Sequence, residues 1–184
     1  EQTKSPSLVG VVQAIFFAGY IFGARHAAGV IGKSSHTKTY FFLTALYLFT
    51  VSSIGAIHSP IAWALLRFAS GYCLSILYIV IESWILIISP GHSRGSAVGM
   101  YMVGLYLSQT LGQLIIHFIE VSSLIPFMIA ISLIALSILP LIGQSIRKEG
   151  EAKIEKRSLL SFYQARPLGV LICALGGAAV GIFF

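Results

Sequence analysis

The sequence predicts an all-α protein, a polytopic bundle of transmembrane helices. Of its 184 residues, 57% are hydrophobic and only 10% are charged, which leaves too little polar surface to cover a soluble core. Its long apolar stretches reach or approach the roughly 20 residues that a spanning helix needs. Strand-type alternation is absent from the sequence, so we expect helices and not a membrane barrel.

The expected helices follow one another along the chain as six apolar stretches: 8–24, 40–57, 61–88, 97–119, 124–145 and 168–184. Most connectors are short, which makes sequential helices antiparallel neighbours. The longest connector, 146–166, is interpreted as a solvated loop, with a short helix on the membrane surface as the alternative. Small residues that let helices approach closely occur in several stretches: Gly19 and Gly23, then Gly99, Gly104 and Gly112, then Gly176, Gly177 and Gly181.

The net charge of +6 is distributed over connectors and not over one continuous face, so we do not expect a nucleic-acid partner. Lysine and arginine concentrate in cytoplasmic connectors of membrane proteins. Here they occupy the first, third and fifth connectors, whereas the second (58–60) and the fourth (120–123) have none: Arg25, Lys33, Lys38, Arg94, Arg147, Lys148, Lys153, Lys156, Arg157 and Arg166. This alternation predicts that residue 1 lies outside and that the connector 146–166 lies in the cytoplasm.

The ends of the chain predict a fragment of a longer protein. The sequence begins with Glu1 and not with Met, shows no signal peptide, and stops at Phe184 within an apolar stretch. The cysteines Cys73 and Cys173 fall in apolar stretches without CxxC spacing, so we interpret them as small buried hydrophobic residues. No disulfide, metal site or cofactor is expected.

The third stretch carries two charges in an apolar context, Arg67 and Glu82. A charge at a bilayer centre costs roughly 2.5 to 3.5 kcal/mol on insertion scales, so each is a functional hypothesis that needs a partner. They cannot pair with each other, because fifteen residues of helix separate them by about 22 Å. At 100° per residue, one polar stripe collects Arg67, Gly71, Ser75, Tyr78 and Glu82.

Two other stretches repeat this pattern of one polar face. The fourth carries Tyr101, Ser108, Gln109, Gly112 and Gln113 on a single face, and the first carries Gln13, Phe17, Tyr20 and Ala24. Three such faces predict a shared cavity. The alternative is that these residues only join helices by hydrogen bonds, which contribute about 0.6 kcal/mol per pair.

Depth along the helix separates the expected roles of the two charges. Counted from Pro60, Arg67 lies about 10 Å and Glu82 about 33 Å down a straight helix. Because the hydrocarbon core is about 30 Å thick, Glu82 is expected near the cytoplasmic face, where Arg94, Arg25 or Lys33 could pair with it.

One motif suggests hydrolase chemistry but lacks its context. The segment 91–95, GHSRG, matches the G-x-S-x-G nucleophile elbow, which needs a strand-to-helix turn and a completed triad. Here a short loop between two spans is expected, and the chain contains no aspartate. The other histidines are scattered over both membrane faces without metal-ligand spacing: His26, His36, His58 and His117.

The block from Arg67 to Gly71, then Glu82-Ser83-Trp84, Arg94-Gly95, Tyr101 and Gly112-Gln113, resembles the fourth and fifth helices of major facilitator superfamily (MFS) transporters, most closely the YcaD-like group. The resemblance implies that Arg67 lines a central cavity, as part of an Arg-x-x-x-Gly motif with Gly71, and that the motif is linked to proton coupling in some members. The segment 23–38 resembles the superfamily's gate loop between helices two and three. It lacks the usual aspartate, and Ser35 stands where glycine precedes the histidine.

The resemblance also implies the domain order. The chain would hold helices two to six plus the start of seven: an N-terminal six-helix bundle without its first helix (1–145), a cytoplasmic interdomain linker (146–166) and the start of the C-terminal bundle (167–184). Both termini of that fold are cytoplasmic, so a missing first helix agrees with residue 1 lying outside.

We therefore expect a secondary active transporter that moves a small solute by alternating access, with protons as the candidate coupling ion. The predicted cavity residues are Arg67, Ser75, Tyr78, Gln109, Gln13 and Tyr20, and the predicted gate or structural residues are Glu82, Arg94, Lys33, His36, Lys38, Gly71 and Gly112. We expect no enzymatic activity, a lipid bilayer of the bacterial inner membrane as surroundings, and a monomer when full length. The alternative is a non-transporting membrane protein, such as a receptor or an assembly scaffold.

Overall fold

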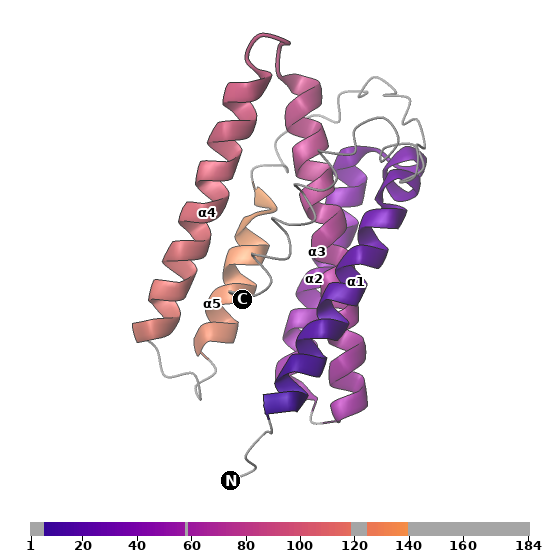
Figure 1. The fold of residues 1–184 in the computed structure, drawn as a ribbon, viewed down its shortest axis with the longest axis vertical. Helices are drawn as coiled ribbons and strands as arrows, with labels where there is room; N and C mark the ends of the chain where they lie inside the picture. Colours follow the sequence, from indigo (N-terminus) through magenta and orange to yellow (C-terminus); the bar gives the residue numbers. More distant parts are fainter. Residues whose placement is uncertain (1–5, 58, 119–124, 140–184) are drawn as a thin grey trace. The chain divides into compact units, whose positions relative to one another are not determined.

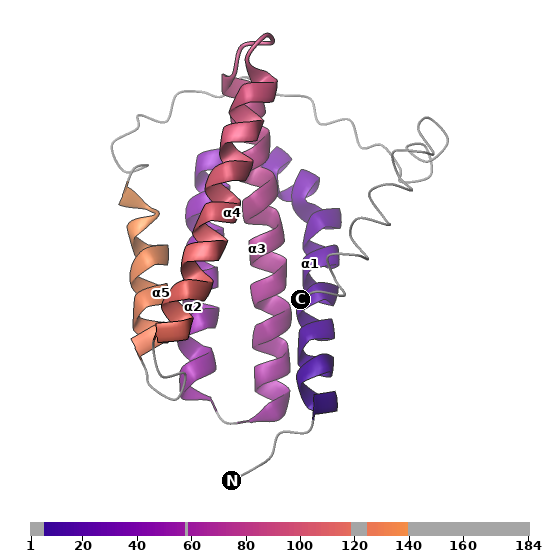
Figure 2. The ribbon, with the colours of Figure 1, turned by 60° about the vertical axis from the view of Figure 1, so that its left-hand side comes forward.

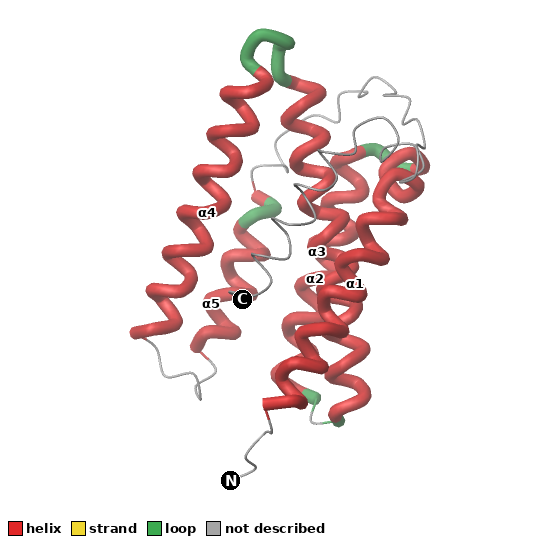
Figure 3. The backbone as a smooth tube through the Cα atoms, in the orientation of Figure 1, coloured by secondary structure: helices red, strands yellow, loops and turns green. Residues whose placement is uncertain are grey.

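The computed structural model describes residues 6–57, 59–118 and 125–139, which contain five helices (Figures 1 and 3). The helices are α1 (Pro6–Lys33), α2 (His36–Ala56), α3 (Pro60–Ile88), α4 (Arg94–Phe118) and α5 (Ile125–Leu136). No strand occurs in the described ranges, and the predicted all-α class is confirmed. The expected linker 146–166 and last helix 168–184 lie outside the described residues, so the expected domain boundaries stay predictions.

The first helix is longer than its apolar stretch. It was expected to end near residue 24 and to give way to a gate loop, but α1 continues to Lys33, and only Ser34 and Ser35 connect it to α2. The loop expectation for 23–33 is therefore wrong. Polar residues such as Arg25 end the apolar run without ending the helix, because hydropathy reports the edge of a membrane and not the last helical hydrogen bond. The Ser35 side chain then caps α2 by accepting from the backbone N–H of Lys38 at 3.3 Å.

α3 is the central helix, and its tightest neighbour is α1 (Figure 2). Their backbones meet at glycines: a Cβ on Gly19 would overlap the Phe68 carbonyl, and one on Gly71 would overlap that of Phe16. On Gly23, a Cβ would lie 2.6 Å from the Tyr72 carbonyl oxygen. Gly19 meets Phe68 and Gly23 meets Tyr72, so the two helices run parallel, as Figure 1 also shows. We call this contact the α1–α3 seam. Gly19 and Gly23 thus act as the sequence predicted.

The buried core lies where α1, α2 and α3 meet. It consists of Ala27, Ile31, Leu43, Cys73, Ile76, Leu77 and Val80. Hydrogen bonds add to it: the Ser70 hydroxyl donates to Thr50 Oγ1 at 3.1 Å, joining α3 to α2. The Trp63 indole donates to the Ile54 carbonyl at 3.3 Å across the short connection between them. The buried, free Cys73 agrees with its interpretation as a small hydrophobic residue.

Large apolar side chains also cover outward faces of these helices. Phe42 is 68% exposed and Met100 is 77% exposed. Two helices in the described residues are long and apolar enough to cross a membrane: Gly10–Lys33, with mean hydropathy 1.4, and Pro60–Ile88, with mean hydropathy 2.0. Such surfaces suit lipid or further helices and not water.

Two helices pack less closely on this core. α5 contacts α2, and just beyond its end the Ser137 hydroxyl accepts from Tyr40 at 3.2 Å. α4 contacts α3, but its glycines are not at a close helix contact. A Cβ added to Gly99, Gly104 or Gly112 would have no neighbouring atom within 4 Å. The close helix contacts predicted at these three positions are therefore not made by the described residues.

Candidate functional site

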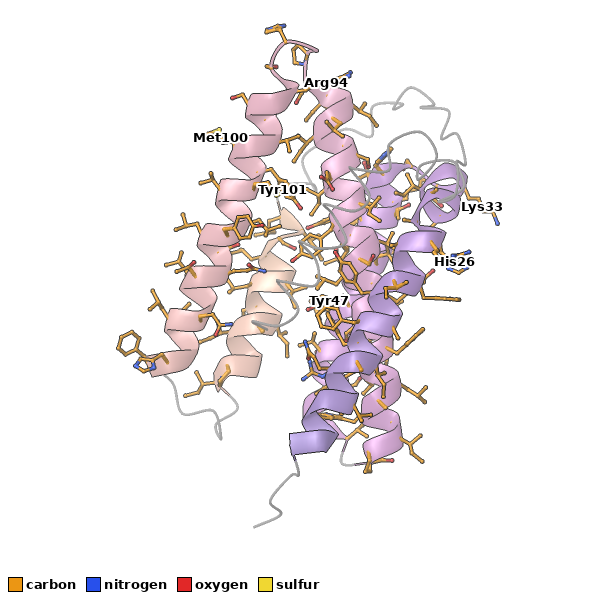
Figure 4. All side chains as sticks on the ribbon, in the orientation of Figure 1. His26, Lys33, Tyr47, Arg94, Met100 and Tyr101 are labelled. Atoms are coloured by element: carbon orange, nitrogen blue, oxygen red, sulfur yellow. The ribbon has the colours of Figure 1, made fainter. Side chains whose placement is uncertain are left out.

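Tyrosines from four helices gather around Tyr78 of α3. Tyr20 on α1, Tyr47 on α2 and Tyr101 on α4 each lie within electrostatic range of the Tyr78 phenol. Figure 4 shows Tyr101 on the side of α4 that faces α3. We call Tyr20, Tyr47, Tyr78 and Tyr101 the tyrosine cluster. It joins four helices through side chains that have an apolar ring and a polar tip.

A groove of about 410 Å³ lies between α3 and α4, beside the cluster. Volumes of roughly 300 to 1,000 Å³ are typical of small-molecule sites. Its lining combines two phenols, one hydroxyl and one amide with apolar surface: Tyr78, Ile81, Tyr101, Gly104, Leu105, Ser108 and Gln109. The groove can therefore hold a small solute with both apolar and hydrogen-bonding parts.

Glu82 lies about one helical turn beyond Tyr78, toward the end of α3 that leads to Arg94. Its carboxylate acts electrostatically on the phenols of Tyr20 and Tyr101, which come from α1 and α4. Within the described ranges Glu82 is the only acidic residue, and its side chain is half-buried. It is therefore the one carboxyl group that the described residues bring to this part of the site.

The expected ion pair between Glu82 and a cytoplasmic cation is not formed among the described residues. The Arg94 side chain instead donates from Nε to the Ser89 carbonyl at 3.3 Å, at the end of α3. Figure 4 shows Lys33 on the far side of the bundle from Arg94, near His26. Lysine or arginine at the C-terminus of a helix satisfies carbonyl groups that lack a helical partner. A gate role for Glu82, Arg94 and Lys33 stays a prediction.

Arg67 lies on the other side of the cluster, about 16 Å from Tyr78 along α3. Its guanidinium carbon is 5.2 Å from the centre of the Trp63 ring, which is a cation–π distance. It also acts electrostatically on Tyr47. Its Nε is buried and has no hydrogen-bond partner among the described residues. Arg67 is thus a positive charge among apolar side chains, and its Nε–H donates no hydrogen bond within the described residues.

The remaining predicted residues lie elsewhere. Ser75 is 1% exposed and belongs to the α1–α3 seam. A Cβ atom added to Gly23 would lie 3.1 Å from the Cβ of Ser75. Gly71 belongs to the same seam. Gln13 and Lys38 are exposed, Gly112 is half-buried, and His36 is buried at the start of α2. Of the six predicted cavity residues, the structure places Tyr78 and Gln109 in the groove and Tyr20 beside it.

Sequence reasoning missed Tyr47 and left Tyr101 out of the predicted site. The sequence places Tyr101 on the polar face of its helix, and that position could have indicated a site residue. No sequence pattern indicates Tyr47, because it stands in an apolar helix and its neighbours Arg67 and Tyr78 are on another helix. Residues 91–93 of the GHSRG segment form the expected turn between spans, where the Ser93 hydroxyl donates to the Pro90 carbonyl at 3.2 Å, and Arg94 and Gly95 begin α4.

The profile of the Major Facilitator Superfamily matches residues 1–184, the whole chain. The chain belongs to the major facilitator superfamily. Its similarity extends to proteins named "Uncharacterized MFS-type transporter YcaD" from Escherichia coli strains HS (O9:H4), K12 / DH10B and O157:H7 (EC4115). Each is 26% identical over 181 residues, covering 96% of this chain and 47% of the relative. No solved structure gives a significant match.

Superfamily membership and the apolar helices together place the chain in a membrane. The resemblance seen in the sequence is thereby confirmed, as is the bundle of membrane helices. The chain spans about half the length of the relatives it matches. The groove and the tyrosine cluster therefore belong to a bundle of MFS type.

Proposed function

We propose that this chain forms part of a secondary active transporter of the bacterial inner membrane that moves a small solute by alternating access. The observation that carries the proposal is the groove of about 410 Å³ between α3 and α4, lined by phenol, hydroxyl and amide groups within apolar helices. Polar groups inside a membrane bundle typically mark a solute path. Superfamily membership supports the same function.

In this proposal the two charges have separate roles. Glu82, beside the groove, is the group that exchanges a proton or a charged solute. Arg67, with an unpartnered Nε and a stacked Trp63, is a positioned cation on the outer side of the tyrosine cluster. Because about 22 Å of helix separates them, one small solute does not contact both at once.

Cysteine labelling tests alternating access without knowledge of the solute. The protein, expressed from its complete gene with every cysteine, Cys73 and Cys173 included, replaced by alanine, receives Gln109→Cys in the groove. A membrane-impermeant maleimide is then added to right-side-out and to inside-out vesicles. We expect labelling from both sides, because alternating access opens the groove to each side in turn.

Ser75→Cys is the matched control, since position 75 is 1% exposed within the α1–α3 seam. It should label from neither side. Labelling of Gln109→Cys from one side only, or from neither, would contradict alternating access and favour a receptor or an assembly scaffold with a static groove.

A further inference from the structure

We propose that the groove between α3 and α4 takes an organic solute with an apolar ring, and that Gly104 sets the size of the ring-bearing part. This inference rests on the proposed transport function, because it names the class of solute for the same groove. Three observations carry it: the open space at Gly104, the place of Gly104 in the lining, and the chemistry of the other lining residues.

Neither the backbone nor the packing of α4 accounts for glycine at position 104. Gly104 lies inside the helix Arg94–Phe118, and no glycine among the described residues has a positive φ. A Cβ added to it would have no neighbouring atom within 4 Å, unlike one added to Gly19 or Gly71. Glycine is also a poorer helix former than every other residue except proline. What the missing side chain leaves is open space at the groove.

Gly104 differs from the other glycines of α4 by its position in the groove lining. The others also have open space at Cβ but are absent from that lining: Gly95, Gly99 and Gly112. Tyr101 precedes Gly104 by three residues and Ser108 follows it by four, so all three share one face of the helix. A side chain at position 104 would therefore occupy part of the groove of about 410 Å³.

The rest of the lining suits a ring that carries a polar group. Tyr78 and Tyr101 line the groove from different helices, and aromatic side chains pack favourably against other rings. Farther along α4, the Ser108 hydroxyl donates to the Leu105 carbonyl at 2.8 Å, so its oxygen can accept a hydrogen bond from a solute. The Gln109 amide can both donate and accept. A solute with an apolar ring and a hydrogen-bonding group therefore matches both parts of the groove.

Two maleimides of different size test the role of Gly104. The cysteine-free protein, expressed from its complete gene and purified in detergent, carries Ser108→Cys as the reporter thiol, because side chains four residues apart on a helix are neighbours. Its reaction rates with N-ethylmaleimide and N-phenylmaleimide are measured by mass spectrometry and divided by the rates with free cysteine. With Gly104 intact, the phenyl reagent should react at least as fast as the ethyl reagent. We expect Gly104→Leu to slow the phenyl reagent by about tenfold or more, as overpacking would, and the ethyl reagent much less.

Gly99→Leu is the matched control, since position 99 is equally open but lies outside the groove lining, and it should change neither rate. Gly104→Ala adds one methyl group that meets no atom within 4 Å, so it should fold and give the phenyl reagent an intermediate rate. If leucine prevents folding, an unchanged rate in Gly104→Ala overturns the inference. A slower phenyl reagent with Gly104 intact, equal slowing of both reagents by Gly104→Leu, no slowing of either, or the same effect from Gly99→Leu would also overturn it.

The two proposals fail in different experiments. If Gly104→Leu leaves both rates unchanged but Gln109→Cys labels from both sides, the transporter stands and Gly104 does not set the size of its solute. If Gln109→Cys labels from one side only, the transport proposal falls, whatever Gly104→Leu does to the reaction rates.

Discussion

At the scale of single residues, Arg67 is a charged side chain whose burial lowers the stability of the folded protein. Its Nε is buried without a hydrogen-bond partner among the described residues, and its guanidinium stacks on the Trp63 ring at 5.2 Å. A cation–π contact contributes about 0.5 to 2 kcal/mol, whereas a charge within a membrane helix costs up to roughly 3 kcal/mol, the value at the bilayer centre. The balance is unfavourable, so folding alone does not explain the arginine.

This balance predicts the effect of Arg67→Met on stability. Methionine keeps most of the length and apolar stem while removing the charge, so the midpoint of thermal unfolding in detergent should stay unchanged or rise. A fall of the midpoint by several degrees would show instead that Arg67 is a structural residue with a strong partner. Trp63→Leu is the control, because it removes the ring beneath the guanidinium and its hydrogen bond to Ile54, and should lower the midpoint.

At the scale of elements, the α1–α3 seam fixes how closely two membrane helices lie. Glycine is needed there because backbone carbonyls occupy the space that a Cβ would take at Gly19 and Gly71. A backbone cannot move aside as a flexible side chain can, so a methyl group at either position must separate the helices.

We therefore expect Gly71→Ala to destabilise the bundle by about 1 to 3 kcal/mol, the usual cost of overpacking a closely packed contact. The measurement is the unfolding free energy in a titration of mixed micelles with a denaturing detergent. Gly99→Ala on α4 is the matched control: no atom lies within 4 Å of its added Cβ, and alanine is the better helix former. Equal stability of the two variants would contradict the claim that close backbone contact in the α1–α3 seam requires glycine at position 71.

How far the sequence predicts these elements depends on which property each one reflects. Helix class and the positions of α2, α3 and α4 follow from apolar runs and turns, and the stripe of α3 contains Tyr78 as expected. The end of α1 at Lys33 does not follow, because Arg25 looks like a membrane boundary. Ser75 and Tyr78 share the stripe, yet one faces α1 and the other the groove, since a stripe some 80° wide spans two neighbours. Pairings across helices, such as Tyr47 with Tyr78, carry no signal in a single sequence.

At the scale of the whole molecule, the charge pattern and the helix order give one orientation in the membrane. α3 connects a short turn around Ser59, without lysine or arginine, to a turn around Ser93 that is followed by Arg94. The two turns lie at opposite ends of the helix (Figure 1). The positive-inside rule then places Ser93 in the cytoplasm and Ser59 outside.

Single cysteines at these turns test the orientation. In the cysteine-free protein, an impermeant maleimide should label Ser59→Cys only from outside and Ser93→Cys only from inside. Labelling of both from the same side would show that α3 does not cross the membrane, and a reversal of sides would invert the depths assigned to Arg67 and Glu82.

The stacking of Arg67 on Trp63 also gives the protein a built-in optical signal. Indole emission depends on the electric field at the ring, and the chain has only two tryptophans, Trp63 and Trp84. In a Trp84→Phe background, Trp63 would be the only indole of this chain, directly beneath the guanidinium. A spectral shift on adding a compound would then report, without any attached dye, that the surroundings of the arginine had changed.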